Sequence, residues 1–471
     1  MSTIIVQPNA DGVGANLLQA AIDNTNPNDT IFLRGGNYSE SKTVDIDKPG
    51  LAIVSYENEP VRFVGGASPA WLHILPQAIG VTIHGLVLGR DGDISKAKQY
   101  DDFAVIVEAN NVRLENLRIF GQTKGIHIKG SCKLPTVVYC DIGPMYQSCV
   151  VLSTSYGTVR GGLLAYNHLH HSWREDGIQF MQDYGAVDPA TDISNLGMVI
   201  YQNLIDYNNE NGIDLKGAGQ IVIDDNVFGF IAGSNDGLLN GWNHGSNATI
   251  TRGANASAGQ VLIRNNDCQV CCSGFHLEDN WIVVHNLITD NNWDAAGGKW
   301  SGYGLMRRGT GSAIAKNNLI RGHGIDDIRL LSGKLIEDGN AQAVGVGVPL
   351  AKVTKSGSGI ALPLDNAGYF TDWFGRADLP KDILWLNGKP YSVLTVDWKK
   401  NVVTLDQETA WTAGDLVTWR SPDPVVGIQE VYVASIKNEL VQLMLEASFT
   451  PTEAAQLRAL LKDRAISARI V

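Results

Sequence analysis

Residues 201–229 read YQNLIDYNNENGIDLKGAGQIVIDDNVFG, and the pattern in this stretch decides the fold. Asn203 lies among apolar residues, a short strand that opens with glycine follows at 212–217, and a second such residue, Asn226, comes next. The Asn recurs at irregular spacings of roughly 20 to 50 residues, which is typical of a solenoid with one supersecondary unit per period. The members of this series are Asn116, Asn167, Asn203, Asn226, Asn266, Asn286 and Asn318.

The units of this solenoid are predicted to be strands. Each repeat contains two or three apolar runs of about four to six residues, which alternate with period two and are too short for helices. Gly, Asn and Asp separate the runs. An Asn at each bend tolerates a left-handed backbone, and its amide can stack on the Asn of the next coil. The sequence therefore predicts an all-β parallel β-helix.

The first residues support this prediction. Residues 15–24 (ANLLQAAIDN) form a short amphipathic pattern, and a helix there would cover the open end of the first coil. The string LLQAAIDNTNPNDTIFLRGGNY, residues 17–38, resembles the N-terminus of right-handed parallel β-helix proteins of the pectate lyase superfamily. The resemblance extends over roughly residues 1–340 and implies a right-handed β-helix with a substrate groove along it.

Three segments are expected. Residues 1–342 form the β-helix with its capping helix, residues 343–425 a small antiparallel β domain, and residues 426–471 a C-terminal helical segment. The pair Asn387-Gly388 is a strong hairpin signal for the second segment, which we expect to pack on the coil rather than bind carbohydrate. Thr450, Pro451 and Glu453 are typical of a helix start in the third.

Composition limits the partners. The formal charge of −12 argues against a nucleic acid bound through its phosphates, and no apolar run approaches the 18 residues of a membrane span. The chain as given lacks a signal peptide, although we expect an extracellular or periplasmic protein, or a component of a phage particle. The six cysteines lie on coil segments and are expected to be buried free thiols rather than a disulfide frame or a zinc site.

Polar side chains gather on the outward face of the glycine-initiated strands. Because side chains alternate along a strand, aligning the inward apolar residues leaves two outward columns, with Thr249 in the first and Thr251 in the second. Adjacent coils are about 4.8 Å apart, so the ionisable members of the middle coils would form one patch. The columns contain His127, Gln179, Asp214 and His276, and then Lys129, Lys216 and Glu278.

Carboxylates at the starts of these strands suggest a metal. Asp176 and Glu210 precede Gly-initiated strands on adjacent coils, and with Asp214 they offer the hard oxygen ligands that Ca²⁺ prefers. Ordinary turn chemistry is the competing interpretation. The string from Glu210 to Lys216 (ENGIDLK) resembles the strand of calcium-dependent pectate lyases that use a lysine base, although Ile213 replaces the aromatic residue of that family.

The resemblance implies β-elimination from an acidic polysaccharide. Removal of the C5 proton of a uronic acid needs a base, together with cations or hydrogen-bond donors that hold the adjacent carboxylate. Lys216 would serve as the base if its surroundings depress its pKa. The other expected participants are His276 and Glu278 as catalytic groups, Arg307 at the substrate carboxylate, Gln179, His127 and Lys129 along the substrate, and Trp242 and Trp300 stacked on sugar rings.

Two rival functions stay open. A glycoside hydrolase would use Asp176, Asp214 and Glu278 as acid and base. The string Gly322-His323-Gly324 resembles one motif of β-helix polygalacturonases, but the companion strings of that family are absent. The second rival is a glycan-binding spike or adhesin that does not cleave its ligand and is held as a homotrimer, whereas an enzyme is expected to be a monomer.

Overall fold

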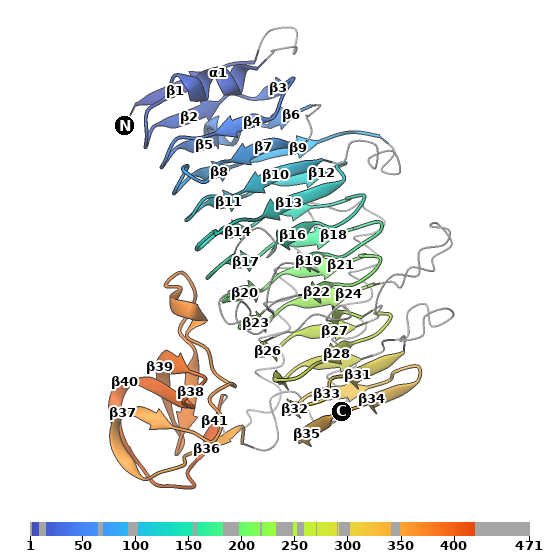
Figure 1. Cartoon of the computed structure of the whole chain (residues 1–471), viewed down its shortest axis with the longest axis vertical. Coiled ribbons are helices and arrows are strands. Elements are labelled where there is room, and N and C mark those ends of the chain that lie inside the picture. Colours follow the sequence, from blue (N-terminus) through green and yellow to red (C-terminus); the bar gives the residue numbers. More distant parts are fainter. Residues whose placement is uncertain are drawn as a thin grey trace.

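The computed structural model of the protein describes residues 2–8, 16–64, 69–92, 102–153, 158–181, 197–216, 219–231, 248–251, 259–269, 271–289, 291, 302–340 and 349–419. Three parallel sheets wind around one long axis, and a separate antiparallel sheet lies beside the lower half of the coil (Figure 1). Each complete coil contributes one strand to each parallel sheet, which confirms the predicted parallel β-helix.

The first sheet is the longest, with 13 parallel strands among the described residues. Its strands pair in register from coil to coil, so that Ile31, Ile53 and Ile83 stack in one inward column. The strands are β1 (Thr3–Val6), β2 (Thr30–Leu33), β5 (Ala52–Ser55), β8 (Thr82–His84), β11 (Arg113–Glu115), β14 (Thr136–Val138), β17 (Leu163–Ala165), β20 (Met198–Tyr201), β23 (Ile221–Asp224), β26 (Val261–Arg264), β29 (Trp281–Val284), β32 (Ser312–Lys316) and β35 (Lys334–Asp338).

The second sheet contains the glycine-initiated strands of the sequence analysis. Ile126, Val150, Ile178, Ile213 and Ile250 pair in succession and point into the core, as predicted. The strands are β4 (Val44–Ile46), β7 (Ala70–Ile74), β10 (Phe103–Val107), β13 (Lys124–Ile128), β16 (Val150–Ser153), β19 (Ile178–Met181), β22 (Ile213–Leu215), β25 (Ile250–Thr251), β28 (Phe275–Leu277), β31 (Tyr303–Arg307) and β34 (Asp326–Leu330).

The third sheet joins the first to the second in each coil. Its inward column includes Ile119, Ile142, Leu169 and Ile205. The strands are β3 (Gly36–Tyr38), β6 (Val61–Phe63), β9 (Leu86–Gly89), β12 (Arg118–Phe120), β15 (Asp141–Ile142), β18 (His168–His170), β21 (Leu204–Asp206), β24 (Val227–Gly229), β27 (Asp267–Gln269), β30 (Leu287–Thr289) and β33 (Leu319–Arg321).

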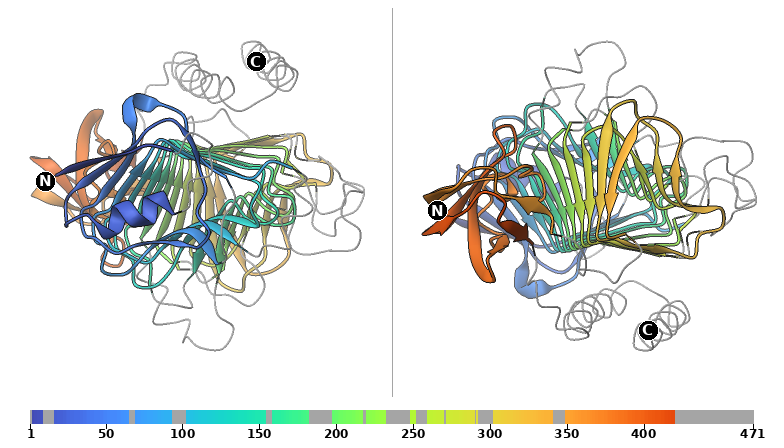
Figure 2. Two further views of the ribbon diagram at one scale, coloured as in Figure 1. Left: turned by 90° about the horizontal axis from the view of Figure 1, so that it is seen from above. Right: turned by 90° about the horizontal axis from the view of Figure 1, so that it is seen from below.

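The N-terminal end of the coil is closed by helix α1 (Leu17–Asp23), which crosses the end of the sheets (Figure 2). Leu18 and Ile22 lie four residues apart on one helix face and are fully buried in the same core as the inward strand columns. The Glu40 carboxylate accepts a hydrogen bond from the backbone N–H of Leu18. The predicted capping helix is therefore confirmed.

A ladder of buried asparagines follows the bend between the first and third sheets. In each step the side-chain oxygen of one Asn accepts hydrogen bonds from both the backbone N–H and the amide of the Asn one coil earlier, as from Asn203 to Asn226 at 2.9 Å each. The ladder comprises Asn167, Asn203, Asn226, Asn266, Asn286, Asn318 and Asn340.

Two details of the predicted Asn series are wrong. The left-handed backbone belongs to the residue before each ladder Asn, such as Gln202 and Asp225 with φ of 49° and 58°, so bending and stacking are divided between neighbours. Asn116 has a φ of 52° and is exposed, which makes it a bend residue. Leu117 occupies the buried position after it.

The antiparallel sheet lies within the segment predicted as a small β domain. Its strand order is β36 (Ala351–Lys352), β41 (Leu416–Thr418), β38 (Ile383–Leu386), β39 (Lys389–Asp397), β40 (Val402–Trp411) and β37 (Gly357–Pro363). Asn387 and Gly388 join β38 to β39 with positive φ angles, as the hairpin signal predicted. Its apolar side chains form a core with outward residues of the first sheet, including Val199, Val222 and Leu262, so this segment packs on the coil.

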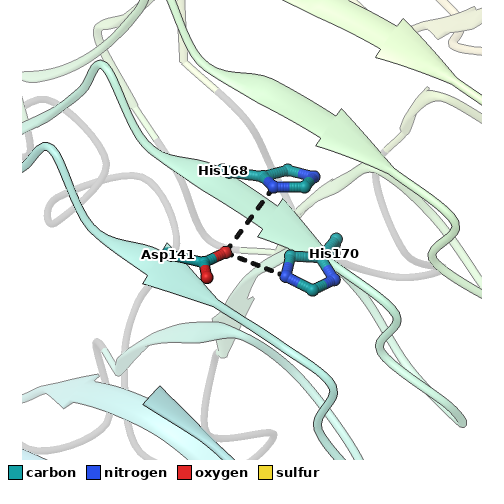
Figure 3. Close-up of side chains that lie close together, drawn as sticks. All are labelled: Asp141, His168 and His170. Carbon is teal, nitrogen blue, oxygen red and sulfur yellow. Dashed lines mark hydrogen bonds and ion pairs between the residues drawn. The ribbon is translucent and has the colours of Figure 1, made fainter. Parts of the chain in front are cut away.

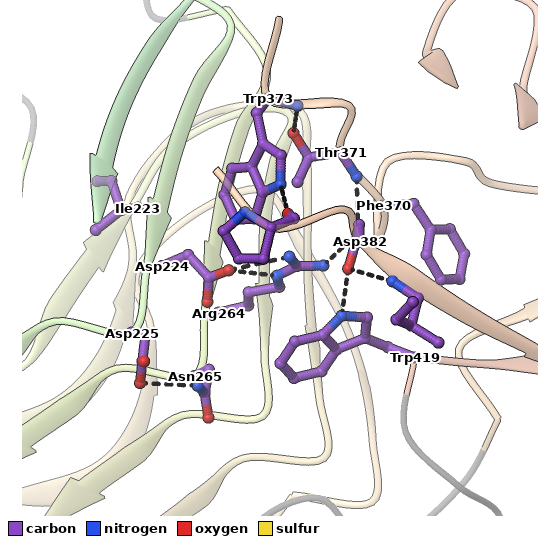
Figure 4. Close-up of polar contacts among 12 residues, drawn as sticks. Ile223, Asp224, Asp225, Arg264, Asn265, Phe370, Thr371, Trp373, Asp382 and Trp419 are labelled. Carbon is purple, nitrogen blue, oxygen red and sulfur yellow. Dashed lines mark hydrogen bonds and ion pairs between the residues drawn. The ribbon is translucent and has the colours of Figure 1, made fainter. Parts of the chain in front are cut away.

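One arginine ties the two parts together. Arg264, at the end of β26, is fully buried and forms ion pairs with Asp224 of the coil at 2.9 Å and Asp382 of the small domain at 2.8 Å. Its guanidinium lies 4.3 Å from the ring centre of Trp419, whose indole N–H donates to Asp382 (Figure 4). The interface thus surrounds one cation with two carboxylates and an aromatic face.

Several predicted features lie outside the described residues. They are the C-terminal helical segment 426–471 and both Trp242 and Trp300. The six cysteines are buried free thiols, as predicted. Within the described ranges no helix has both the length and the apolar character needed to cross a membrane.

Replacing a ladder residue should destabilise the coil. Asn226→Ala removes the acceptor for two donors of Asn203 and leaves buried polar groups without partners, so the free energy of unfolding should fall by about 2–3 kcal/mol. Urea denaturation followed by circular dichroism measures this. The control Asn26→Ala changes an exposed residue outside the ladder and should stay within about 0.5 kcal/mol of the wild type.

Removing the interface cation should also be costly. Arg264→Met leaves Asp224 and Asp382 buried without their counter-ion, and the expected loss is about 3–5 kcal/mol in the free energy of unfolding. Tryptophan fluorescence during urea denaturation reports on it, since Trp419 contacts the guanidinium. In the control Arg329→Met, the broken ion pair with Asp326 is exposed and the loss should stay below about 1 kcal/mol. Equal losses of unfolding free energy in the two variants would mean that the buried ion pairs of Arg264 stabilise the fold no more than the exposed pair of Arg329.

Candidate active site

Four of the predicted site residues come together at the start and on the outward face of β19 and β22. We call Asp176, Glu210, Asp214 and Lys216 the acid-lysine cluster. Asp176 directly precedes Gly177, and Glu210 precedes β22, with its backbone N–H bonded to the carbonyl of Glu175 one coil earlier. Asp214 and Lys216 alternate with the inward Leu215 and therefore point outward.

The three carboxylates of this cluster are buried. The exposed fractions of Asp176, Asp214 and Glu210 are 0%, 2% and 8%. Lys216 Nζ lies 2.6 Å from Asp214 Oδ2, and Asn211 Nδ2 donates to Asp176 Oδ1 at 2.8 Å. The cluster therefore combines three carboxyl groups with one ammonium group.

Burial and mutual repulsion raise the pKa of two of these acids. Burial, followed by the charge of Asp214, raises the pKa of Glu210 to about 8. Burial, followed by the charges of Glu210 and Asp214, places the pKa of Asp176 well above its ordinary value. At neutral pH Glu210 is therefore largely a carboxylic acid and can donate a proton.

The same charges act in the opposite direction on the lysine. Burial lowers the pKa of Lys216, but the neighbouring charges of Asp214, Asp176 and Glu210 outweigh it and raise that pKa above its ordinary value. The condition under which Lys216 was expected to act as a base, a depressed pKa, is absent from this arrangement. Lys216 is here a fixed cation.

The donor atoms of the predicted calcium ligands Asp176, Glu210 and Asp214 do not all lie within 4.8 Å of one another. Among the described residues, donor atoms of three potential ligands approach within 4.8 Å of one another at Asp141, His168 and His170, and not at the acid-lysine cluster. The ammonium of Lys216 already occupies the place beside Asp214 that a cation would take.

The coil on either side extends this face. Gln179 pairs directly with Asp214, and its side-chain oxygen accepts a hydrogen bond from Ser148 Oγ at 3.4 Å. Thr251 pairs with Asp214 on the other side, so Thr251 belongs to the first outward column and the predicted place of Thr249 and Thr251 is two residues out of register. The face therefore presents Gln179, Asp214 and Thr251 in line.

His276 and Glu278 lie on the same face two coils further along, about 10 Å from the acid-lysine cluster. His276 is fully buried, with Nε2 3.1 Å from Ser273 Oγ. Glu278 Oε1 lies 3.4 Å from Arg308 Nε, and Arg308 also donates to Thr251 Oγ1 at 3.2 Å. These side chains form a second polar group on the outward face.

Arg307 is not on this face. It pairs with Leu277 and Leu330 in the inward column, is fully buried, and forms an ion pair with Asp279. Since neighbouring residues of a strand point to opposite sides, a shift of one residue exchanges the two arginines. Of these two arginines, Arg308 is therefore the one on the outward face.

His127 and Lys129 belong to a third polar group, three coils before Asp214. The His127 ring stacks on Phe103 with centres 4.5 Å apart, and burial, together with the charge of Lys129, lowers its pKa to about 4. Lys129 forms an ion pair with Glu108 at 3.2 Å, and His73 bonds the same carboxylate at 2.8 Å. The outward face thus carries charged groups over much of its length.

The third sheet carries a cluster that the sequence analysis missed. Asp141 of β15 contacts His170 at 3.0 Å and His168 at 3.6 Å, both on β18 (Figure 3). His168 also contacts Asp206 of β21 at 2.9 Å. The run His168-Leu-His170-His171 was the available signal, because alternation places His168 and His170 on one face.

No protein-family model and no curated protein sequence matches this chain. Solved structures do. The A-module of the mannuronan C-5 epimerase AlgE4 from Azotobacter vinelandii is 13% identical, with a TM-score of 0.50 over 71% of this chain and 94% of the epimerase. The catalytic unit of a GH87 α-1,3-glucanase from Streptomyces thermodiastaticus is 14% identical, with a TM-score of 0.50 over 72% and 68%. Pectate lyase Pel9A is 12% identical, with a TM-score of 0.44 over 74% and 81%.

The protein has the parallel β-helix fold of the solved structures with a TM-score of 0.50. The resemblance expected from residues 17–38 is thereby confirmed at the level of the fold. Since function on a shared fold depends on the side chains of the site, the chemistry has to be argued from the acid-lysine cluster.

The raised pKa of Glu210 predicts an unusual dependence of stability on pH. The folded protein holds a proton on Glu210 up to about pH 8, whereas the unfolded chain releases it near the ordinary value of 4.5. Stability should therefore fall as pH rises through this window. Glu210→Gln removes the penalty, so the variant should be more stable than wild type by roughly 2–4 kcal/mol at pH 8 and about equal at pH 4.

Urea denaturation at several pH values tests this prediction. Glu57→Gln, a change at an exposed carboxylate, is the control and should follow the wild-type pH profile. A Glu210→Gln profile parallel to wild type would show that Glu210 ionises normally in the folded protein.

Proposed function

We propose that the protein is a carbohydrate-active enzyme that cleaves an acidic polysaccharide at the acid-lysine cluster. The observation that carries the proposal is a buried Glu210, whose pKa is raised to about 8 by burial and by the charge of Asp214, close to the Asp214–Lys216 ion pair. Acids with strongly shifted pKa values, grouped with a specific counter-ion, are common at sites of proton transfer. The same fold is found in the GH87 α-1,3-glucanase and in the A-module of the mannuronan C-5 epimerase.

Glu210 is the proposed general acid. Both β-elimination and hydrolysis break the bond to a glycosidic oxygen, and in both a proton delivered to that oxygen makes it a better leaving group. A carboxyl group with a pKa of about 8 still holds its proton at neutral pH. The charge of Asp214 next to it helps to keep that proton in place by repulsion.

In a lyase, Lys216 would remove the C5 proton, as the resemblance to lysine-base pectate lyases implies. This role requires the pKa of Lys216 to fall on substrate binding, because its three acidic neighbours raise it in the free protein. As a cation, Lys216 would instead bind the uronate carboxylate of the substrate.

Hydrolysis is the second candidate, and the charge state of the cluster favours it. Glu210 would protonate the leaving oxygen while the Asp214 carboxylate, held by Lys216, acts on water or on the sugar itself. A pair of carboxyl groups in which one is kept protonated by its surroundings is the general arrangement of glycosidases.

Product analysis separates these chemistries. The protein is incubated with a panel of uronic-acid polysaccharides, with added calcium and with chelator, while ultraviolet absorbance and reducing ends are measured. Ultraviolet-absorbing unsaturated ends establish elimination, whereas new reducing ends without absorbance establish hydrolysis. Loss of activity with chelator would show that the carboxylates rearrange around calcium. If neither product forms, the cleavage proposal is wrong and a glycan-binding spike becomes the leading function.

Substitutions then assign the roles. Glu210→Gln should lower kcat/KM about 10²–10⁴-fold, because Gln cannot donate a carboxyl proton. Lys216→Arg keeps the charge but cannot be deprotonated, so it should abolish activity if Lys216 is the base and retain much of it if Lys216 is a fixed cation. Lys352→Ala, at an exposed position of the small domain, is the control. Full activity in Glu210→Gln would remove Glu210 from the mechanism.

A further inference from the structure

The third sheet presents two imidazoles and a carboxylate whose donor atoms converge. We propose that Asp141, His168 and His170 bind a divalent transition-metal ion of the zinc class. The site would join β15 and β18, two successive coils of the third sheet, on the face that points away from the core. It is separate from the acid-lysine cluster of the second sheet.

The spacing of the donors is close to that of a chelate. Asp141 Oδ1 lies 3.0 Å from His170 Nε2 and 3.6 Å from His168 Nδ1, and the three donor atoms all lie within 4.8 Å of one another. Ligands bound to one zinc ion at about 2.0–2.1 Å are separated by about 3.0–3.4 Å. The distance from Asp141 Oδ1 to His170 Nε2 is therefore already that of two ligands on one ion, and the distance to His168 Nδ1 is about 0.2 Å longer than the upper value.

The strand geometry explains why these three atoms meet. His168 and His170 are two residues apart on β18, so both side chains leave the same face, and their rings stack with centres 4.1 Å apart. Asp141 pairs directly with His168 across the sheet, and its carboxylate reaches both rings (Figure 3). The fixed register of the coil thus brings the three donors together, and one ring would have to turn out of the stack to direct its nitrogen at a shared ion.

A second layer of contacts orients the imidazoles. His168 Nε2 contacts Asp206 Oδ1 at 2.9 Å, which directs the other ring nitrogen, Nδ1, towards Asp141. His170 Nδ1 contacts His171 Nδ1 at 2.7 Å, while Nε2 faces Asp141. A carboxylate behind a ligating imidazole is the usual outer partner in zinc sites, where it fixes the ring and raises its basicity. Asp206 is 1% exposed, so its contact with His168 is shielded from solvent.

The donor set selects the class of metal. Calcium and magnesium prefer oxygen ligands, whereas two imidazole nitrogens with one carboxylate suit zinc and its neighbours. Three protein ligands leave a fourth position for water or another ligand. The Asp141 side chain is 19% exposed while those of His168 and His170 are 2% and 7% exposed, so the ion would enter from the Asp141 side.

The test measures metal binding directly and does not depend on activity. The full chain is treated with chelator, dialysed, and titrated with Zn²⁺ in competition with a chromophoric chelator. Co²⁺ is used in parallel, because ligation by nitrogen and oxygen gives visible bands without the intense ultraviolet thiolate band that the buried cysteines would produce. One ion per chain, with an N/O-type cobalt spectrum, is the expected result.

Variants locate the ion. His170→Ala should weaken zinc binding more than 100-fold, and Asp206→Asn by about 10–100-fold as an outer partner. Asp141→Asn keeps the size of the side chain and provides a second ligand variant if His170→Ala does not fold. His84→Ala, a histidine of the first sheet, is the control and should bind as wild type does.

Two results would overturn the proposal. One is that wild type binds zinc no more tightly than Asp141→Asn does. The other is a thiolate-type cobalt spectrum that persists in both ligand variants, which would assign the ion to the cysteines. Neither result bears on cleavage at the acid-lysine cluster, so this site and the proposed function can fail separately.

Discussion

The fixed register between successive coils is the constraint on which the rest of this structure depends. Each ladder Asn satisfies a buried backbone N–H and an amide of its neighbour, so the bend of one coil cannot slip relative to the next without losing several buried hydrogen bonds. Parallel pairing then repeats at about 4.8 Å along all three sheets. Residues far apart in sequence therefore become neighbours at a predetermined height.

This register also creates the electrostatics of the molecule. Stacking of acidic residues from adjacent coils, as at Asp176 and Glu210, brings like charges close together. The repulsion is reduced because the raised pKa of Glu210 favours its protonated form and because the ammonium of Lys216 pairs with Asp214. On the third sheet the same stacking places Asp141 and Asp206 on either side of His168. The coil thus concentrates titratable groups that an irregular surface would disperse.

The sequence predicts the inward columns well, because Gly-initiated strands such as 125–130 and 212–217 alternate cleanly between apolar and polar residues. It misplaces residues where that alternation is weak. Arg307 and Arg308 are adjacent and identical in type, so only the observed pairing of Leu277 with Arg307 decides which faces outward. The direction of the pKa shift at Lys216 likewise depends on how near three carboxylates lie, which spacing along the chain cannot give.

The acid-lysine cluster and the Asp141–His168–His170 cluster differ in the groups that surround their carboxylates. At the acid-lysine cluster the cation is covalently part of the chain, so the site keeps its balance of charge without an ion and its acids remain available for proton transfer. On the third sheet Arg118 pairs with Oδ2 of Asp141 at 3.6 Å, while Oδ1 of the same carboxylate faces two imidazole nitrogens. A metal that prefers nitrogen would therefore gain more there than beside Lys216, where it would first have to displace an ammonium from a buried carboxylate.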